Sequence, residues 1–239
     1  RQQGARIAVF SMPKSGSTYL SELLTKVLGV PRVNLDTAAE SNTAAGCNAR
    51  EDELDELAII QATLLYSSFV AQHHTRATAT LLYSLRNYCI CPIVMFRKIP
   101  DCLVSFDDMM MEWNHSDSHA ETMWRIFYNT AGRLPYGYCS LTIDQRLQVL
   151  VDAWGRWYLE FYISWKRAKL SGFSDPLFIR YEEHVAKPDS LFELLQESLG
   201  LEEAQLELLR EHLHMRVRFN KGVLGRGEAM SADQRSSLV

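Results

Sequence analysis

The sequence lacks the features that mark several common classes of protein. No apolar run approaches the 18 residues of a transmembrane helix, and the N-terminus shows no charged-then-apolar pattern of a secretion signal. The formal net charge is −4, whereas a general nucleic-acid binder needs a basic surface for its phosphate contacts. We therefore expect a cytoplasmic protein with no membrane and no nucleic-acid partner. The chain does not begin with Met, which leaves open whether it belongs to a longer protein.

Cysteine is scarce, and the count is odd. Five cysteines without a secretion signal favour reduced thiols over a disulfide framework. Cys89 and Cys91 form a C-x-C pair that lacks the spacing of a metal finger, and no other cluster of ligand residues stands out. We therefore predict no metal site.

The pattern of apolar residues indicates the fold class. The chain has 239 residues, of which 47% are apolar, and this suits a single domain over residues 1–239. Strand-like runs that are apolar throughout alternate with segments of helical periodicity. This alternation predicts an α/β fold of three layers, with a central parallel sheet flanked by helices. The expected strands are 7–10, 68–72, 88–96 and 176–181. The expected helices are 18–28, 51–65, 77–87, 100–113, 144–170, 188–199 and 202–213, and 32–50 is expected to be a loop.

The first strand leads into a loop of small and hydroxyl residues, "SMPKSGSTY". Unpaired N–H groups at the start of the following helix carry partial positive charge and suit a phosphate or similar anion. Gly16 allows close approach of the backbone, and Lys14 adds a charge. The hydroxyls of Ser15, Ser17 and Thr18 add donors. The alternative is an ordinary capped helix with Lys14 in solvent.

The loop differs from the phosphate loop of ATPases and kinases. That motif is G-x-x-x-x-G-K-[ST], with the lysine after the second glycine. Here Lys14 precedes Gly16, and no glycine stands four or five residues before Gly16. This difference disfavours a small-molecule kinase, which stays open as an alternative together with a non-catalytic nucleotide-binding module.

Four segments together resemble a known family. "PKSGSTY" resembles the loop of sulfotransferases that use 3′-phosphoadenosine-5′-phosphosulfate (PAPS). "FRKIPDCLVS" matches in the spacing of Arg97 and Ser105, "FIRYEE" in Tyr181, and "FNKGVLGRG" in Lys221 and Gly222. The segments follow the family's order over residues 12–227. The resemblance implies the P-loop NTPase-like sulfotransferase fold and transfer of a sulfuryl group from PAPS to a hydroxyl.

The resemblance also implies roles for individual residues. The loop would hold the 5′-phosphosulfate, and Tyr19 would pack on the adenine. An arginine fork suits phosphate, but Arg97 paired with Asp101 on the surface is the alternative. Asn220 stands where the family has an arginine, for which Arg218 or Arg226 could compensate. The implied donor-binding residues are Lys14, Ser15, Gly16, Ser17, Thr18 and Tyr19 at the 5′ end, Arg97, Ser105, Lys221 and Gly222 at the 3′-phosphate, and Tyr181 at the nucleotide.

A general base is expected after the second strand, within "SFVAQHHTR". The family pattern K-T-H aligns with Gln72, His73 and His74, which makes His74 the implied base and Lys14 its catalytic partner. His73 remains the alternative, since adjacent strand residues point to opposite faces. Gln72 replaces the family's lysine, and Arg76 is a candidate to supply that charge. His115 and His119 are further rivals for the role of base.

The sequence predicts the acceptor site less specifically than the donor site. Aromatic residues are concentrated between 113 and 165, after three methionines at 109–111. Residues 105–140 are expected to form an acceptor pocket or lid, whereas the aromatic stripe of 144–170 is expected to be core. The expected acceptor is a small-molecule or carrier-tethered hydroxyl. The oligomeric state is left open.

Overall fold

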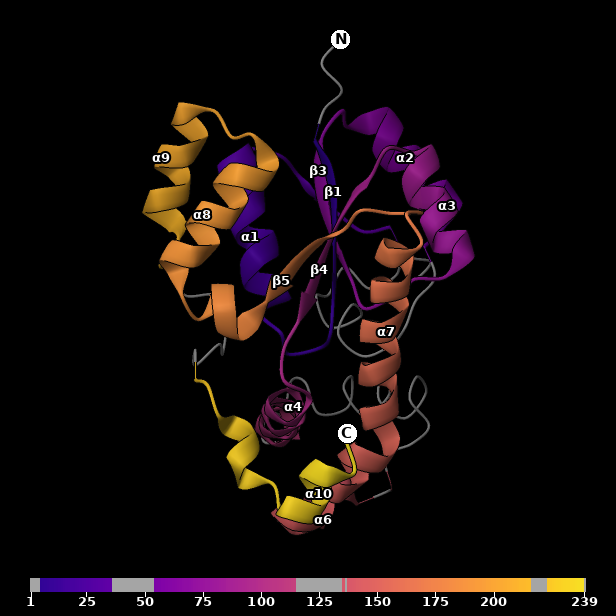
Figure 1. The fold of residues 1–239 in the computed structure, drawn as a ribbon, viewed down its shortest axis with the longest axis vertical. Coiled ribbons are helices and arrows are strands. Elements are labelled where there is room, and N and C mark those ends of the chain that lie inside the picture. The colour runs from indigo at the N-terminus through magenta and orange to yellow at the C-terminus, as the bar shows by residue number, and fades with distance from the viewer. Residues whose placement is uncertain (1–4, 36–53, 115–134, 136, 216–222, 239) are drawn as a thin grey trace.

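The computed structural model describes residues 5–35, 54–114, 135, 137–215 and 223–238. A sheet of five parallel strands in the order β2-β3-β1-β4-β5 lies at its centre (Figure 1). This confirms the predicted α/β fold with a parallel sheet. The strands are β1 (Arg6–Ser11), β2 (Arg32–Val33), β3 (Phe69–His73), β4 (Cys91–Phe96) and β5 (Leu177–Arg180).

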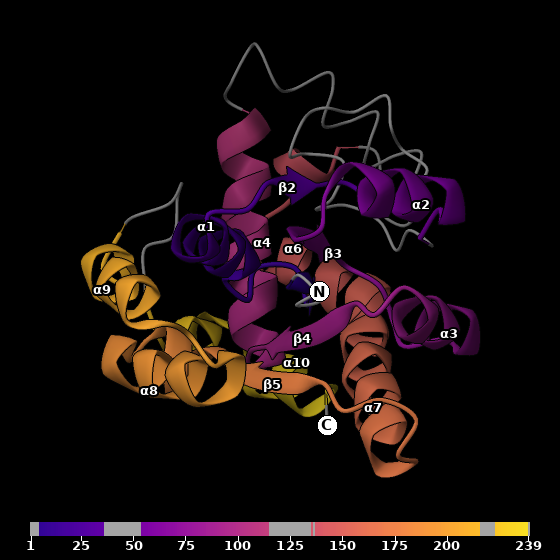
Figure 2. The same ribbon diagram turned by 90° about the horizontal axis from the view of Figure 1, so that it is seen from above.

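Helices cover both faces of this sheet, as Figure 2 shows from above. Helices α1, α8 and α9 lie on one face, and α2, α3 and α7 lie on the other (Figure 1). The α-helices are α1 (Ser17–Leu28), α2 (Glu56–Leu65), α3 (Ala79–Asn87), α4 (Ile99–Asn114), α6 (Ile143–Leu150), α7 (Arg156–Leu170), α8 (Pro188–Leu199), α9 (Glu203–His212) and α10 (Ala232–Ser236). Shorter turns are η2 (Tyr138–Ser140), η3 (Val151–Gly155), η4 (Tyr181–Val185) and η5 (Arg226–Ala229).

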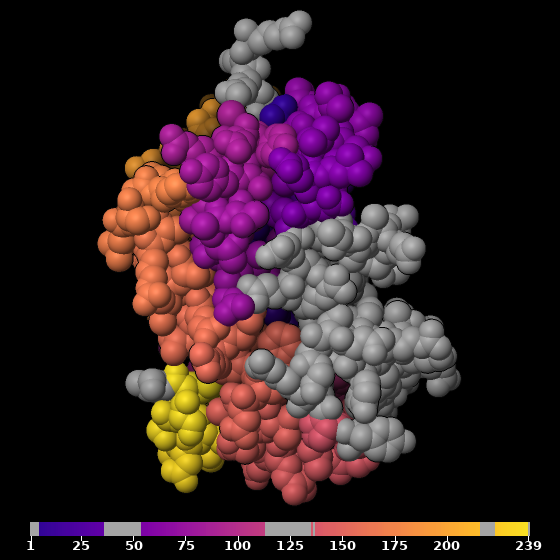
Figure 3. All heavy atoms as spheres, turned by 90° about the vertical axis from the view of Figure 1, so that its right-hand side faces the viewer, coloured from indigo at the N-terminus to yellow at the C-terminus, as the bar shows by residue number. Residues whose placement is uncertain are grey.

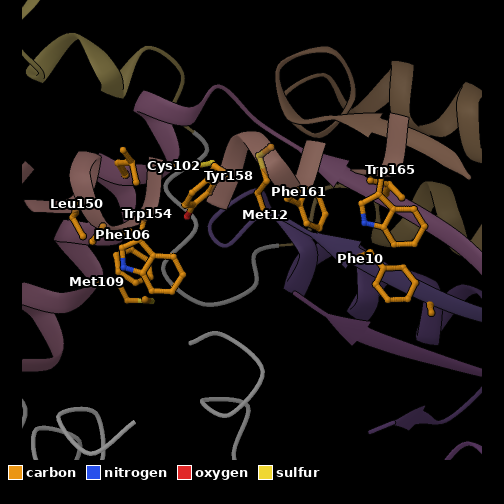
Figure 4. Packing of buried hydrophobic residues seen from close by; sticks show 14 of the residues in the cluster. Phe10, Met12, Cys102, Phe106, Met109, Leu150, Trp154, Tyr158, Phe161 and Trp165 are labelled. Carbon is orange, nitrogen blue, oxygen red and sulfur yellow. The ribbon is translucent and has the colours of Figure 1, made fainter. Parts of the chain in front are cut away.

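The two faces of the sheet have separate apolar cores. Along β1, Ile7 and Val9 pack toward α1, α8 and α9, while Ala8 and Phe10 pack toward the opposite layer. This is the alternation that strand geometry dictates, and apolar residues on both faces explain the continuous apolar run. Figure 4 shows the second core extending from Phe10 and Trp165 to Phe106 and Trp154.

The aromatic stripe predicted as core is buried. Trp154, Tyr158, Phe161 and Trp165 all belong to the core cluster that includes Phe10. The single helix predicted at 144–170 is nevertheless divided into α6 and α7 by the π-helical turn η3. Such a turn inserts a residue into the α-helical repeat, and periodicity alone does not reveal it.

Several predicted boundaries are corrected by local contacts. A two-residue strand, β2, occurs at the start of the segment predicted as a loop, because it pairs with β3 at the edge of the sheet. Helix α2 begins at Glu56 rather than at residue 51, since Asp55 is its N-cap and accepts from the Leu57 N–H at 2.9 Å. Strand β3 is shifted by one residue and ends at His73.

The C-terminal segment returns to the start of α4. The Gln234 side chain donates to the Asp144 carbonyl at 2.9 Å, and Leu238 packs where Gly155 has no side chain. Gly227 lies so close to Pro100 that an added Cβ would be 2.4 Å from the proline's Cβ. Figure 3 shows this segment in yellow against α6. The glycine-rich sequence is thereby held beside the carboxyl end of β4.

Two further expectations concern absences and thiols. Within the described residues, no helix is both long and apolar enough to cross a membrane. The four cysteines in that part of the chain are free thiols, as expected, with Cys89 and Cys91 exposed. Cys47 lies outside the described residues.

Candidate functional site

The predicted site residues gather at the carboxyl edge of the sheet. The loop containing Lys14 follows β1, His74 follows β3, Arg97 follows β4 and Tyr181 follows β5. In a parallel sheet these strand ends share one edge, where ligands of open α/β folds bind. In Figure 1 this is the edge that faces α4. The structure therefore brings together residues that are up to 167 positions apart in the sequence (181 − 14).

The backbone of the loop forms a concave set of donors. Lys14 has φ 68° and Gly16 has φ 91°, both in the left-handed region. Gly16 is the N-cap of α1 and offers no side-chain cap to the first N–H groups of the helix. Left-handed residues between right-handed ones turn successive N–H groups inward and form an anion-binding nest. A lysine in this conformation carries about 1 kcal/mol of strain, and such strain clusters at functional sites.

Hydrogen bonds from elsewhere fix the conformation of the loop. Three consecutive carbonyls already accept from protein donors, which holds the loop in place before any ligand binds. They are Met12, which accepts from the Ser15 N–H at 3.2 Å and the Ser15 hydroxyl at 2.6 Å, Pro13, from the Tyr158 hydroxyl at 3.1 Å, and Lys14, from Arg97 at 3.2 Å. The Ser15 hydroxyl is thus engaged within the loop, and its contact with a phosphate stays a prediction.

The Lys14 ammonium lies in a partly desolvated, positively charged environment. Its Nζ is 3.5 Å from the sulfur of Met109 on α4. Burial lowers the pKa of Lys14 from 10.5 to about 8, and Arg226 and Arg97 add to the shift by repulsion. Lys14 is partly buried and α1 has no side-chain cap, so the alternative of an ordinary capped helix with Lys14 in solvent is wrong. An anion bound in the loop would stabilise the charged form of Lys14.

Arg97 is buried rather than paired on the surface. It is 5% exposed, and its guanidinium stacks 4.2 Å above the centre of the Tyr181 ring. One nitrogen donates to the Val223 carbonyl at 2.7 Å, and Asp101 lies 3.7 Å away. The Nε atom is buried without a hydrogen-bond partner among the described residues. An unmet donor on a buried cation is costly, which suggests a ligand.

Asp101 connects Arg97 to the glycine-rich segment. Besides facing Arg97, its carboxylate accepts from the backbone N–H of Gly225 at 3.1 Å and of Gly227 at 2.7 Å. Arg226, named above as a possible substitute for the missing arginine, forms an ion pair with Asp108 on α4. Lys221 and Gly222 lie outside the described residues, so their predicted contacts remain predictions.

Replacing Asp101 with asparagine is expected to loosen this segment. The neutral amide loses the charge that faces Arg97 and can accept from only one of the two N–H groups well. We expect the free energy of unfolding to fall by about 2–3 kcal/mol and the Gly225 and Gly227 amides to exchange hydrogen faster. Chemical denaturation and hydrogen exchange measure the two effects. Asp175→Asn, at an exposed carboxylate far from this segment, is the control, and unchanged protection of both amides in Asp101→Asn would contradict the role of Asp101.

Tyr181 and Tyr19 are more enclosed than their predicted roles imply. Tyr181 is buried beside the loop, since a Cβ at Gly16 would lie 3.2 Å from its ring. Tyr19 belongs to the core between α1 and α9, and its hydroxyl donates to the Leu213 carbonyl. Burial raises the pKa of Tyr19 to about 12. The nucleotide contacts predicted for both tyrosines stay predictions, with little ring surface available at Tyr19.

His74 is held in one tautomer at the end of β3. Its Nδ1 lies 2.7 Å from the carbonyl oxygen of Ser11. A carbonyl can only accept, so Nδ1 carries the proton and the basic lone pair is on Nε2. Burial lowers the pKa of His74 from 6.5 to about 4, opposed by the hydrogen bond to Ser11. His74 is therefore neutral at pH 7, as a general base requires.

His73 differs from His74 although the two are adjacent. It pairs with Phe10 in the sheet, and its ring is 6.1 Å from that of Phe10. Its Nε2 atom is buried without a partner in the described ranges, and burial together with repulsion from His74 lowers its pKa to about 3. The ring of His73 thus lies against Phe10, and the choice of His74 over His73 as the base stays a prediction. His115 and His119 lie outside the described residues.

Other sequence expectations have specific outcomes. Arg76 forms an ion pair with Glu160 on α7, and its role in place of the lysine missing at Gln72 stays a prediction. Ser105 is buried on α4, the helix that follows Arg97, and its phosphate contact stays a prediction. Of residues 105–140, the first part continues α4, Tyr138–Ser140 forms η2, and 115–134 and 136 are outside the described residues.

No group of three or more His, Cys, Asp or Glu in the described chain has metal-binding geometry.

The comparisons with known proteins bear on the fold. No family model matches this sequence, and no curated protein matches it. The structure is similar to that of the mouse sulfotransferase SULT7A1 complexed with PAP, with a TM-score of 0.57 and 16% identity. That match covers 97% of this chain and 81% of the mouse protein. A putative kinase from Chloroflexus aurantiacus matches 54% of this chain and 80% of its own at 20% identity, but its TM-score of 0.33 is too low to indicate a shared fold. The chain therefore has the fold of a sulfotransferase.

Proposed function

We propose that this chain transfers a sulfuryl group from PAPS to a hydroxyl of a small-molecule or carrier-tethered acceptor. The observation that carries the proposal is the buried Arg97, which donates to the Lys14 carbonyl at 3.2 Å and keeps an unmet Nε donor, beside an uncapped helix N-terminus. Arg97 and Arg226 each face a carboxylate, Asp101 and Asp108, so it is the Lys14 ammonium and the unmet Nε donor of Arg97 that favour a ligand with an anionic group at each of these two places. A nucleotide phosphorylated at both its 3′ and 5′ ends has this chemistry.

The donor would occupy two subsites. The nest at Lys14–Ser17 would hold the 5′-phosphosulfate, which suits its backbone donors and its ammonium. Arg97, with Ser105 on the following helix, would hold the 3′-phosphate, and Lys221 and Gly222 would close over it. The ordering of the loop by Tyr158 and Arg97 supports this arrangement, because little reorganisation is needed on binding.

The chemistry would be an in-line displacement at sulfur. The acceptor oxygen forms a bond to sulfur while the bond from sulfur to the bridging phosphate oxygen breaks. The acceptor proton passes to Nε2 of His74, and the charge that develops on the leaving phosphate is stabilised by Lys14. The products are a sulfate ester and adenosine 3′,5′-bisphosphate (PAP). Phe106, Met109 and Trp154, which lie together in Figure 4, would face the acceptor side, because the Met109 sulfur lies 3.5 Å from Nζ of Lys14.

Calorimetric titration with PAP, AMP and ATP tests the donor. We expect PAP to bind at least tenfold more tightly than AMP, because only PAP offers a 3′-phosphate to Arg97. Arg97→Met should abolish that difference, whereas Arg156→Met, at an exposed arginine of α7, should not. Tighter binding of ATP than of PAP would favour the kinase alternative. If PAP binds but no alcohol, phenol or cell-extract component gains a sulfuryl group from PAPS by mass spectrometry, a non-catalytic module is favoured.

A further inference from the structure

A buried glutamine connects the loop to a charged pair on the surface. Gln72 lies on β3 and is only 3% exposed. Its Nε2 donates to the Ser17 hydroxyl oxygen at 2.8 Å, and its Oε1 accepts from Nη2 of Arg32 at 2.6 Å. Arg32 lies on β2 and contacts Glu22 at 3.5 Å. A chain of hydrogen bonds therefore runs from solvent to the first residue of α1.

The direction of this chain is fixed by chemistry. An arginine side chain has only donors, so it must face the oxygen of the Gln72 amide. The amide nitrogen of Gln72 then faces Ser17, and the Ser17 oxygen must accept. The hydrogen of the Ser17 hydroxyl is consequently left to point elsewhere. This polarity follows from the three side chains alone and needs no ligand.

The hydrogen of the Ser17 hydroxyl has few possible acceptors. It is 4% exposed, and no second hydrogen-bond partner is present in the described parts of the chain. Serine in the first turn of a helix often donates back to a carbonyl three or four residues earlier. Here those carbonyls belong to Lys14 and Pro13, which accept from Arg97 and Tyr158, and among the described residues the Ser17 hydroxyl is bonded to neither of them. An anion held by the nest would supply the missing acceptor.

We propose that Gln72 is a positioning residue that fixes the Ser17 hydroxyl as a donor to the anion held by the loop. Arg32 polarises the Gln72 amide, and the amide in turn makes the Ser17 hydroxyl a stronger donor. The family that this sequence resembles has a charged lysine at the position of Gln72. In this chain the charge of Arg32 acts on the Ser17 hydroxyl through the neutral amide of Gln72. The inference rests on the proposed function only for the identity of the anion, a phosphoryl or sulfuryl group.

A double-mutant cycle tests the proposal, with inorganic pyrophosphate and PAP as probes in calorimetric titrations. Ser17→Ala and Gln72→Leu are each expected to weaken binding of both probes by about tenfold, the range of one hydrogen bond to a charged group. The double variant should bind no more weakly than Ser17→Ala, since Gln72 acts through Ser17. Gln61→Leu, the same substitution at an exposed position of α2, is the control and should bind as the wild type does.

Reversal of the hydrogen bond provides a second, nearly isosteric test. In Gln72→Glu the introduced carboxylate only accepts, so the Ser17 hydroxyl donates to it and is withdrawn from the anion. We expect a loss of at least tenfold in affinity at pH 8 with the fold retained by circular dichroism. The proposal is overturned if Gln72→Glu binds pyrophosphate like the wild type, or if the Gln72→Leu and Ser17→Ala losses are additive.

The two probes separate this inference from the proposed function. If the wild type binds pyrophosphate but not PAP and the cycle is non-additive, the positioning role of Gln72 stands and the nucleotide assignment falls. If PAP binds and the cycle is additive, the reverse holds. Failure of the wild type to bind either probe overturns both.

Discussion

Replacing Lys14 with methionine is expected to lower kcat/KM for sulfuryl transfer by about 10²–10³-fold, the usual cost of one group that stabilises charge in the transition state. Methionine retains a similar length and apolar stem, and it removes the ammonium that we propose faces the breaking bond. The fold should persist, because the loop is held through backbone carbonyls and not through the Lys14 side chain. The loss should therefore appear mainly in kcat.

The measurement does not require the natural acceptor. With PAP and 4-nitrophenyl sulfate the reaction runs in reverse and releases 4-nitrophenolate, which is followed by absorbance. Lys98→Met removes the same charge from an exposed side chain close to Arg97, and it should retain full activity. If Lys14→Met and Lys98→Met lose the same small amount of activity, Lys14 does not stabilise the transition state.

The pKa of Lys14 adds a pH dependence with a definite sign. Its role requires the charged form, and in the free protein burial and two neighbouring arginines lower its pKa to about 8. We expect kcat/KM, which reports the free protein, to fall as pH rises above about 8. A bound anion raises the pKa of Lys14 again, so the same fall in kcat should occur at higher pH. The alkaline limb should be absent in Lys14→Arg.

The sequence predicted the fold wherever burial and periodicity dominate. The strand at Ile7–Phe10 and the buried stripe through Tyr158 and Trp165 are set by continuous or helically spaced apolar residues. The turn η3 was missed because a single π-helical turn does not show in the apolar periodicity. The strand β2 was missed because it depends on a tertiary contact, its pairing with β3. A local sequence pattern does not predict which distant segment will pack against it.

In the candidate site, too, some features could be predicted from the local sequence and others depend on tertiary contacts. Lys14, His74 and Arg97 stand at strand ends, and parallel strands bring their carboxyl ends together, so their convergence could be predicted. The hydrogen bonds that organise them could not. Asp101 was visible only as a possible partner of Arg97, and its bonds to the backbone of Gly225 and Gly227 depend on a segment more than 120 residues away. Likewise, nothing in the sequence indicated that Arg32 would reach Gln72.

Replacing His74 with asparagine is expected to lower kcat/KM by about 10²–10⁴-fold, the typical contribution of a general base. The asparagine amide can still donate to the Ser11 carbonyl, as Nδ1 does, but it offers no basic nitrogen in the place of Nε2. His73→Leu should retain most of the activity, because that ring lies against Phe10. A larger loss in His73→Leu than in His74→Asn would assign the base to His73.

The pH dependence of the free energy of unfolding is the control, because it shows whether each substitution removes a buried histidine. Folding lowers the pKa of His73 to about 3 and that of His74 to about 4, from 6.5 in the unfolded chain. Between these values the unfolded chain binds more protons, so stability falls as pH falls from about 6.5 toward 4. Each histidine contributes up to about 1.4 kcal/mol per pH unit in this window. Both variants should therefore show a flatter dependence of the free energy of unfolding on pH, measured by urea denaturation. Because the effect on stability is shared while the effect on rate is confined to His74→Asn, a loss of activity in that variant alone identifies proton transfer and not folding as its cause.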